Sequence, residues 1–452
     1  MKKSRFNIHF GYKGIEVYYN SFTDKYIGLP QKLMSIFESD NWFEILSSKY
    51  PKHLPILEAA GLIVPDTHDE LAKIRLANKH AAFGDKDIYL MVFPTQDCNL
   101  KCWYCYESHV KGSEMSEEIM NRIVKMVEKK VIDNSVNSVR LAFFGGEPMI
   151  GFDRIAYPLS VRIKNILDAA GKQFQTFFVT NSSLITSETV SKLKDINPLF
   201  QITLDGNREK HNSVRIWKKD NSGTYDSIIA AIKQITSKIY NPDSYKMPIV
   251  TIRINYDNST LEHIDEMIDD LKDINKQSVS IYLERVWQTK KHVDFRQQQL
   301  LLTAVNKIRN NGFHVGFGNF GTKSVSCPAE TDHFLIVNYD ANLYRCNGRT
   351  LTHETAEGYL NEDGSVSWNE EIRAKRLGLA TFENPRCLNC PMLPRCMGPC
   401  SQKLMEHGGF NDNICTINAL DVSLEKHLES EFEMRNHMMG NKIVNVNSQT
   451  EQ

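Results

Sequence analysis

Three cysteines crowd one short stretch of the sequence, DCNLKCWYCYES at positions 97–108. They are Cys98, Cys102 and Cys105, with Trp103 and Tyr104 between the last two. Three thiolates alone are an incomplete ligand set for a closed zinc site, which takes four ligands. Thiolates are also the usual ligands of iron–sulfur clusters. The spacing favours a cubane cluster in which three irons bind cysteine and one iron stays open.

The other seven cysteines follow after a long gap and form a second group. The densest part reads CLNCPMLPRCMGPC, residues 387–400. Thiolates at this spacing hold either zinc or an iron–sulfur cluster, and the spacing alone leaves both open. The members of this group are Cys327, Cys346, Cys387, Cys390, Cys396, Cys400 and Cys415.

Composition and charge narrow the class of protein. The 452 residues are 41% hydrophobic and 24% charged, which is typical of a globular protein, and the length predicts several domains. A formal net charge of −1 argues against nucleic-acid binding. The start, MKKSRFNIHFGYKG, has no apolar core of a secretory signal, and no apolar run reaches the roughly 18 residues of a membrane span. We therefore expect a cytoplasmic protein with reduced cysteines and no membrane contact.

Residues 86–311 alternate β-rich runs with amphipathic stretches, a pattern typical of βα units. One expected helix is 116–131, where Ser116 can act as the N-cap. Repeated βα units predict a parallel sheet, either an incomplete barrel or an open doubly wound sheet. The expected strands are 87–93, 138–144, 176–180, 200–204, 250–255 and 279–284.

Polar residues follow these strands where the chain leaves the sheet. In parallel α/β folds the reactive groups gather at the carboxyl ends of the strands, so these residues are expected on the same rim as the first three cysteines. Asp205 and His211, in LDGNREKHNSVR, are candidates to face the substrate and handle a proton. A turn and a surface histidine explain these two residues at least equally well. The rim residues are Gly145, Gly146, Glu147, Pro148, Asn181, Ser182, Thr203, Asp205, Arg253, Asn255, Glu284 and Arg285.

The combination of CxxxCxxC after the first strand with GGEP after the second resembles the radical S-adenosylmethionine (SAM) superfamily. The later cysteines resemble the SPASM extension of peptide-modifying members, such as maturases of ribosomally made peptides. The resemblance implies a partial (β/α)6 TIM-like barrel at 85–315, a SPASM domain at 316–436 and a flexible tail at 437–452. Residues 1–84 resemble a winged-helix-like peptide-binding domain, for which a plain capping domain is the alternative. In this segment, 6–20 alternate like a hairpin with its turn at Tyr12-Lys13-Gly14, and 29–39 and 53–64 predict two short helices and a closing strand.

The resemblance also implies roles for the rim. Cys98, Cys102 and Cys105 would bind three irons of a [4Fe-4S] cluster, and SAM would chelate the fourth iron. Tyr104 would lie near the adenine, GGEP with Glu147 near the methionine ammonium, and Arg253 near its carboxylate. Thr203, Asn181 and Ser182 would also contact SAM, and Asp205 is a candidate catalytic residue.

The later cysteines would hold two auxiliary clusters by the same resemblance. Cys387, Cys390, Cys396 and Cys415 would ligate one completely. Cys327, Cys346 and Cys400 would hold the other, and since no further cysteine precedes Cys327 back to Cys105, one iron there would be open or bound by another residue. Ala341 stands where relatives usually have glycine, and we expect Asp340-Ala341-Asn342 to make the turn.

The function that follows from this resemblance is reductive cleavage of SAM to a 5′-deoxyadenosyl radical that modifies a side chain of a peptide or protein. The product would be a thioether or carbon–carbon crosslink, and the reductant a flavodoxin or ferredoxin. Within the superfamily, the alternative is an anaerobic sulfatase-maturating enzyme that makes formylglycine. Outside it, the alternatives are a zinc-binding scaffold or regulator and a redox-sensing iron–sulfur protein.

Overall fold

The computed structural model describes residues 1–84, 86–286, 288, 295–318 and 324–438, and its contacts divide the chain into two compact units. Unit 1 comprises Met1–Ala82, Asn319–Glu330 and Leu379–Gln452, and unit 2 comprises Phe83–Gly318 and Thr331–Gly378. These boundaries differ from the expected segments. Residues 1–82 pack with the second half of the 316–436 segment, and residues 331–378 pack with the barrel. Of the expected tail, residues 439–452 lie outside the described chain.

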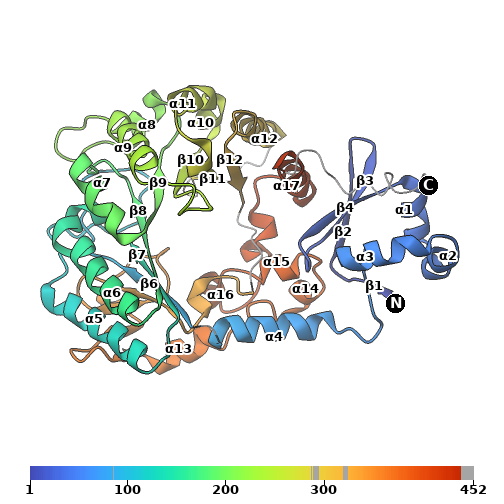
Figure 1. Ribbon diagram of the computed structural model, residues 1–452, viewed down its shortest axis with the longest axis horizontal. Helices are drawn as coiled ribbons and strands as arrows, with labels where there is room; N and C mark the ends of the chain where they lie inside the picture. Colours follow the sequence, from blue (N-terminus) through green and yellow to red (C-terminus); the bar gives the residue numbers. More distant parts are fainter. Residues whose placement is uncertain (85, 287, 289–294, 319–323, 439–452) are drawn as a thin grey trace. The chain divides into compact units, whose positions relative to one another are not determined.

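Unit 2 is built on a parallel sheet whose first six strands run in sequence order, β6-β7-β8-β9-β10-β11 (Figure 1). All six expected strands are confirmed. The sheet continues through β12 (His314–Phe317), which is parallel to β11, and through β13 (Phe334–Val337), which is parallel to β6. The six strands are β6 (Asp87–Val92), β7 (Ser138–Phe143), β8 (Gln173–Thr180), β9 (Pro198–Thr203), β10 (Val250–Tyr256) and β11 (Val279–Arg285).

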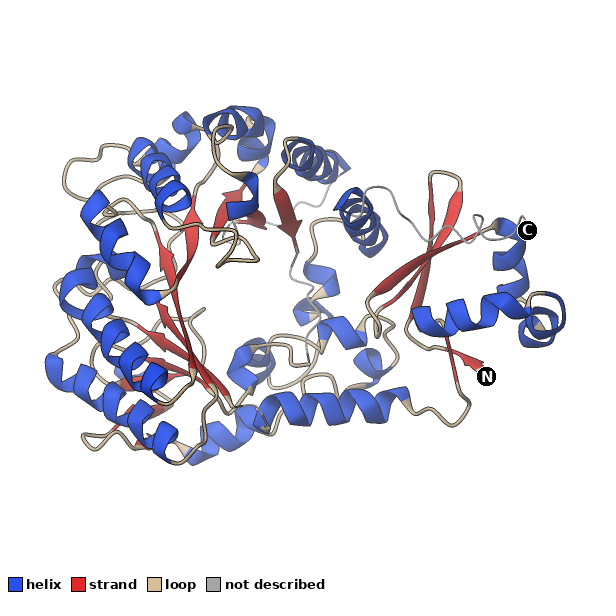
Figure 2. Ribbon diagram, in the orientation of Figure 1, coloured by secondary structure: helices blue, strands red, loops and turns tan. Residues whose placement is uncertain are grey.

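Helices cover the outer face of this curved sheet (Figure 2), which gives the partial barrel expected for the α/β class. Ser116 caps α5 as predicted, because its hydroxyl accepts a hydrogen bond from the Ile119 N–H. The helices are α5 (Glu117–Ile132), α6 (Tyr157–Ala169), α7 (Ser187–Leu193), α8 (Arg208–Val214), α9 (Tyr225–Lys238), α10 (Asn258–Glu262), α11 (Ile264–Asp270), α12 (Phe295–Asn310) and α13 (Glu370–Leu377).

Strands β8 to β11 alternate along most of their length between buried and less buried side chains, and this alternation defines the inner face of the barrel. In β10, Ile252 and Ile254 are buried, whereas Arg253 and Asn255, which alternate with them, are only partly buried. Successive side chains of a strand point to opposite faces, so one set packs under the helices and the other faces the interior. Parallel pairing places Arg253 directly beside Thr203 of β9. The pairing register of the strands therefore places residues from separate strands side by side on the inner face of the sheet.

A short antiparallel extension follows β13 and carries the Ala341 turn. β14 (Asn342–Tyr344), β15 (Gly358–Leu360) and β16 (Val366–Trp368) pair in order. Ala341 has φ +66°, a left-handed conformation that favours glycine. Asp340 supports the turn by accepting a hydrogen bond from the Asn342 N–H at 3.1 Å. The expected turn is thus made, without the glycine.

The N-terminal part of unit 1 is a three-stranded sheet followed by three short helices. β2 (Asn7–Tyr12) and β3 (Ile15–Asn20) form the predicted hairpin, in which Lys13 and Gly14 both have positive φ. β4 (Lys25–Leu29) completes the order β2-β3-β4, and β1 (Lys2–Lys3) pairs with the expected closing strand β5 (Ile63–Val64). The predicted helices are α1 (Gln31–Glu38) and α3 (Leu54–Ala60), while α2 (Trp42–Lys49) and α4 (Glu70–Phe83) were not among the sequence predictions.

The β2-β3-β4 sheet is buried on both faces, which explains why residues 1–82 join the cysteine-rich segment. Tyr18 and Ile27 pack in one core cluster with residues of α1–α3. The opposite face contributes Val17 and Tyr19 to a second cluster with Leu428 and others. The C-terminal helices are α14 (Pro385–Leu388), α15 (Leu393–Cys396), α16 (Ser401–His407) and α17 (Leu424–Met438).

A buried ion pair reinforces this second core cluster. Arg395 contacts Glu431 through two hydrogen bonds of 2.6 and 3.0 Å, and its guanidinium lies over the Tyr19 ring. A bidentate pair of this kind is geometrically specific, so it fixes α17 against the sheet. In the described part of the chain, none of the helices has the length and apolar character that crossing a membrane requires.

Candidate functional site

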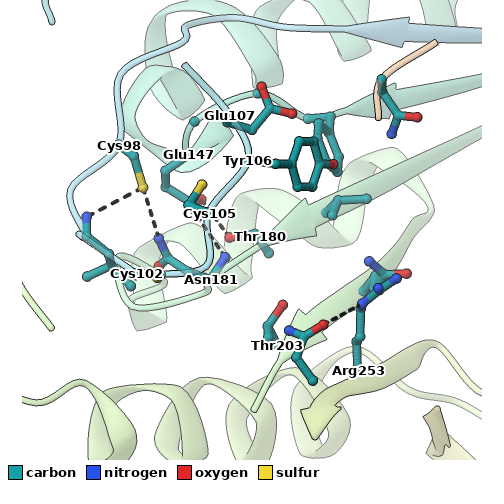
Figure 3. Close-up of a pocket in the computed structure, with 18 of the residues that line it drawn as sticks. Cys98, Cys102, Cys105, Tyr106, Glu107, Glu147, Thr180, Asn181, Thr203 and Arg253 are labelled. Atoms are coloured by element: carbon teal, nitrogen blue, oxygen red, sulfur yellow. Dashed lines mark hydrogen bonds between the residues drawn. The ribbon is translucent and has the colours of Figure 1, made fainter. Parts of the chain in front are cut away.

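The three closely spaced cysteines line a cavity of about 360 Å³ in unit 2 (Figure 3). Their loop leaves the carboxyl end of β6, and the Cys105 N–H donates to the Cys102 carbonyl at 3.1 Å. Burial raises the pKa of Cys98 to about 12, and it also raises the pKa of Cys102 and Cys105. Thiols in this setting ionise when a metal compensates the buried charge. The donor set therefore fits a cluster that contributes its own positive irons.

The cavity wall comes from the ends of several strands, as the sequence predicts. Of the proposed SAM contacts, Pro148 and Ser182 are not among the lining residues, and neither is the candidate catalytic Asp205. Ser182 is fully buried with φ +56°. The predicted residues that do line the cavity are Cys98, Cys102, Tyr104, Cys105, Gly145, Gly146, Glu147, Asn181, Thr203, Arg253, Asn255 and Arg285.

The GGEP segment lies directly against the chain that leads into Cys98. The Gly146 N–H donates to the Thr95 carbonyl at 3.2 Å, and the Glu147 N–H donates to the Asp97 carbonyl at 2.9 Å. A Cβ at Gly146 would lie 2.1 Å from the Asp97 oxygen, closer than van der Waals contact permits. This position therefore needs glycine for close approach between two backbones.

Glu147 joins the ends of β7 and β8 inside the protein. Its Oε1 accepts from the Thr180 hydroxyl at 2.6 Å and the Met149 N–H at 3.0 Å, and its Oε2 accepts from the Asn181 N–H at 2.7 Å. Burial raises the pKa of this carboxyl, while these donors oppose the rise. Glu147 thus positions Asn181, and its contact with a methionine ammonium stays a prediction.

We expect Glu147→Gln to lower the free energy of unfolding by about 1–3 kcal/mol, because an amide NH2 would face one of these buried donors and leave it unsatisfied. Urea unfolding followed by circular dichroism measures the change. The matched control is Glu128→Gln, at an exposed position of α5, which should stay within about 0.5 kcal/mol. Equal stability of the two variants would contradict the role given to Glu147.

Asn181 and Arg253 are held from opposite sides of the cavity. Asn181 Nδ2 donates to Asn99 Oδ1 at 2.9 Å and lies 4.0 Å from the Cys98 sulfur. Arg253 Nε donates to Asn255 Oδ1 at 3.0 Å, and Figure 3 shows Arg253 close to Thr203. The amide and the guanidinium are thereby oriented before any ligand binds.

Tyr104 is held by three polar partners, which the sequence did not reveal. Its hydroxyl donates to Asp205 Oδ2 and accepts from Arg215 Nη1 at 2.7 Å and Asn255 Nδ2 at 3.1 Å. Asp205 is buried behind it and accepts from the Asn255 backbone N–H at 3.2 Å. Asp205 therefore supports the cysteine loop through Tyr104, and its catalytic role stays a prediction.

His211 is not a surface residue, which corrects the sequence interpretation. It is fully buried, and its Nδ1 accepts the Asp205 backbone N–H at 3.1 Å. Burial lowers its pKa well below the usual value, so the ring is neutral.

Two further residues of the cavity, Glu107 and His109, are not among the sequence predictions although they directly follow the cysteine motif. His109 Nε2 is 3.6 Å from the Cys105 sulfur. Burial raises the pKa of Glu107 to about 8, and its Oε1 has no hydrogen-bond partner among the described residues. Their position directly after CxxxCxxC is the sequence feature from which they could have been predicted.

In unit 1, four of the later cysteines come together. Burial raises the pKa of Cys387, and the neighbouring Cys390 and Cys415 thiols add to that rise. Burial raises the pKa of Cys396 to about 11, with Cys387 and Cys390 as further contributors. The Asn384 side chain orients the loop by accepting from the Cys387 N–H at 3.0 Å. The four thiols predicted to share one auxiliary cluster are thus neighbours.

Cys327, Cys346 and Cys400 are distributed over the two units. Cys327 and Cys400 belong to unit 1, where the Ser326 hydroxyl donates to the Pro399 carbonyl at 2.8 Å. Cys346 belongs to unit 2, where it follows β14. A shared cluster for these three stays a prediction.

None of the ten cysteines, all within the described residues, is in a disulfide. Within the same residues, no three His, Cys, Asp or Glu side chains converge as ligands of one metal ion. The ligands of a cubane cluster do not have to converge on one point, because each thiolate binds its own iron.

Comparison with known proteins identifies the class. Residues 92–271 match the radical SAM superfamily. The cysteine-type anaerobic sulfatase-maturating enzyme of Clostridium novyi is 21% identical over 369 residues, which are 73% of this chain and 92% of that protein. The radical SAM cyclopropyl synthase TigE of Paramaledivibacter caminithermalis is 24% identical over 374 residues, 75% of this chain and 74% of that one.

Solved structures share the fold. Native anSMEcpe with bound AdoMet and Kp18Cys peptide has a TM-score of 0.53 at 17% identity, covering 80% of this chain and 99% of that one. Streptococcus suis SuiB bound to precursor peptide SuiA has a TM-score of 0.51 at 17% identity, covering 92% and 99%. The chain thus carries a radical SAM domain and is an enzyme that uses SAM with [4Fe-4S] chemistry. It resembles the maturases that modify peptides and proteins.

Proposed function

We propose that this enzyme modifies a side chain of a peptide or protein substrate and forms a thioether or carbon–carbon crosslink. The observation that carries the proposal is the cavity in which three thiols meet the oriented polar residues of neighbouring strands. The fold adds support, because the SuiB comparison spans 92% of this chain and the anSMEcpe comparison spans 80%. SuiB was solved with a precursor peptide, which is the substrate class we assign here.

In this proposal the residues of the cavity bind and orient the reactants. Cys98, Cys102 and Cys105 would hold three irons of a [4Fe-4S] cluster and leave the fourth iron for SAM. When bound and reduced, such a cluster would supply the electron for cleavage of SAM to a radical that removes hydrogen from carbon. The backbone at Gly145 and Gly146 and the side chains of Glu147, Asn181, Thr203 and Arg253 position SAM, and a flavodoxin or ferredoxin provides the electron.

The N-terminal sheet is the proposed contact for the substrate's leader segment. In the described part of unit 1, β2 and β4 each pair only with β3, so both are edge strands, the kind of element to which a peptide adds a strand. A capping role is the alternative. Binding of a fluorescently labelled precursor peptide to the full-length protein, compared with the same peptide lacking its leader, separates the two.

A second proposal concerns the group of four thiols in unit 1. We expect Cys390→Ala to lower iron and sulfide by about one cluster's content, because the remaining three thiols cannot complete the site. Anaerobic reconstitution followed by iron and sulfide analysis measures this. The electron paramagnetic resonance (EPR) signal that responds to SAM should persist, since its predicted ligands lie in unit 2. An unchanged iron content, or zinc in place of iron, would contradict the assignment.

The test of the function itself is reconstitution with iron and sulfide, reduction with dithionite, and incubation with SAM and candidate precursor peptides. A crosslink lowers the peptide mass by two hydrogens and introduces no aldehyde. Formylglycine, the product expected of a sulfatase-maturating enzyme, reacts with a hydrazide probe. Formation of 5′-deoxyadenosine without any peptide product would leave the enzyme class intact and refute the substrate assignment.

A further inference from the structure

Arg215 is a buried cation in the wall of the cysteine-lined cavity, although it follows helix α8 rather than a strand. Arg215 is 8% exposed and is one of the residues that line this cavity. Nη1 donates to the Tyr104 hydroxyl at 2.7 Å and lies 3.6 Å from Asp205 Oδ2. Nε has no hydrogen-bond partner among the described residues. A buried guanidinium with a donor still available is costly unless nearby negative charge compensates it.

The chain around Arg215 is attached to the cysteine loop by backbone pairing. The Lys101 N–H donates to the Ile216 carbonyl at 3.0 Å, and the Lys218 N–H donates to the Asn99 carbonyl at 2.9 Å. Leu100 and Trp217 form an antiparallel bridge between these bonds. The guanidinium therefore keeps its place relative to the loop that carries Cys98 and Cys102.

His211 and Thr224 fix the backbone of Arg215 itself. Because His211 Nδ1 accepts the Asp205 N–H, its proton resides on Nε2 and is directed to the Thr224 hydroxyl at 3.0 Å. That hydroxyl in turn donates to the Arg215 carbonyl at 2.8 Å. The Arg215 N–H donates to the His211 carbonyl at 2.8 Å. A relay of buried hydrogen bonds thus holds this arginine rigidly.

Arg215 lines the same cavity as all three thiols. The Tyr104 hydroxyl, from the loop between Cys102 and Cys105, bonds to both the guanidinium and the Asp205 carboxylate. Asp205 is buried behind Tyr104 and is not among the residues that line the cavity. Of the two charges, the arginine is therefore the one that borders the space between the thiols.

We propose that Arg215 is a positioning residue that raises the reduction potential of the cluster held by Cys98, Cys102 and Cys105, an inference that rests on the proposed ligand set. One electron from a one-electron donor converts the cluster core from 2+ to 1+, without forming or breaking a bond. The added negative charge is stabilised by a fixed cation in a site of low polarity. Removing that cation makes the cluster harder to reduce.

The experiment is an EPR-monitored dithionite titration of the full-length, anaerobically reconstituted enzyme, in which the relevant cluster is the one whose signal changes on addition of SAM. Arg215→Met should give a lower midpoint potential than wild type, whereas Arg215→Lys should stay near the wild-type value. Asp205→Asn, which removes the opposing charge, should raise the potential. These opposite directions distinguish an effect of charge from a general loosening of the site.

An unchanged potential in Arg215→Met, or equal shifts in the Met and Lys variants, would overturn the proposal. If Arg215→Met does not retain the cluster, Asp205→Asn decides: a raised potential supports the role of charge, and an unchanged or lowered one overturns it. Absence of any SAM-responsive signal in wild type would instead refute the ligand set. Failure to modify a peptide would refute only the proposed substrate.

Discussion

Replacing Cys98, Cys102 and Cys105 together with alanine is expected to reduce 5′-deoxyadenosine formation to the level of a protein-free control. Each thiolate would bind one iron of the cluster that reduces SAM, so no partial site remains. The three residues line one cavity, and their loop is attached to β6 and to the GGEP segment. Chromatographic assay of 5′-deoxyadenosine after reduction with dithionite measures the loss.

The same triple variant should retain iron and sulfide at the later cysteines. Four of those thiols are neighbours within unit 1, whereas the first three belong to unit 2. Cys390→Ala is the matched control, because it removes a thiol from the other group. Wild-type 5′-deoxyadenosine formation by the triple variant would contradict the site, and loss of all iron would contradict two independent groups of ligands.

The parallel sheet could be predicted from sequence because its strands are long and strongly apolar. Each of the six expected strands lies within three residues of the observed bounds, as for 250–255 against Val250–Tyr256. The strands β14, β15 and β16 have three residues each, too few for a periodic pattern, and they form only because tertiary pairing selects them. Helix α2 was missed for a related reason, since only Trp42 and Leu46 are buried in it.

The packing of the N-terminal sheet against the cysteine-rich segment could not be predicted from local pattern. Val17 and Tyr19 read as one apolar face of a hairpin, and nothing near them indicates that Leu428 covers that face. The sequence pattern shows that a strand has a buried face. Long-range contacts decide which other segment of the chain covers that face.

The residues of the cavity show the same difference between what local pattern predicts and what long-range contacts decide. Residues that directly follow strands, such as Asn181 and Thr203, were found because parallel topology places strand ends on one rim. Arg215 follows a helix, and it reaches the cavity only through pairing of residues 216–218 with the cysteine loop. His211 looked like a surface residue because it lies in a polar stretch, and only the structure reveals its bond to the Asp205 backbone.

The second large effect is expected from Gly146→Ala, which should slow SAM cleavage by about 100-fold. A Cβ there would lie 2.1 Å from the Asp97 oxygen and 2.4 Å from its carbonyl carbon, and backbone cannot move aside as a flexible side chain can. Gly146 does not have the positive φ of Gly145, so the clash rather than backbone conformation causes the loss. Moving residue 97 shifts Cys98, and a misplacement of about 1 Å in a reactive site costs roughly 100-fold in rate.

Gly316→Ala is the control for this prediction, since its Cβ would meet Tyr282 at 3.7 Å, an ordinary contact on strand β12. It should leave SAM cleavage within about twofold of wild type, because the added methyl fits without displacement. Measuring iron content and the unfolding midpoint of both variants separates a displaced cysteine loop from an unfolded protein. A wild-type rate for Gly146→Ala would mean that GGEP does not lie against residues 95–97 in the working enzyme. The cysteine loop would then be positioned by Tyr104, by the Asn181–Asn99 hydrogen bond and by its pairing with residues 216–218.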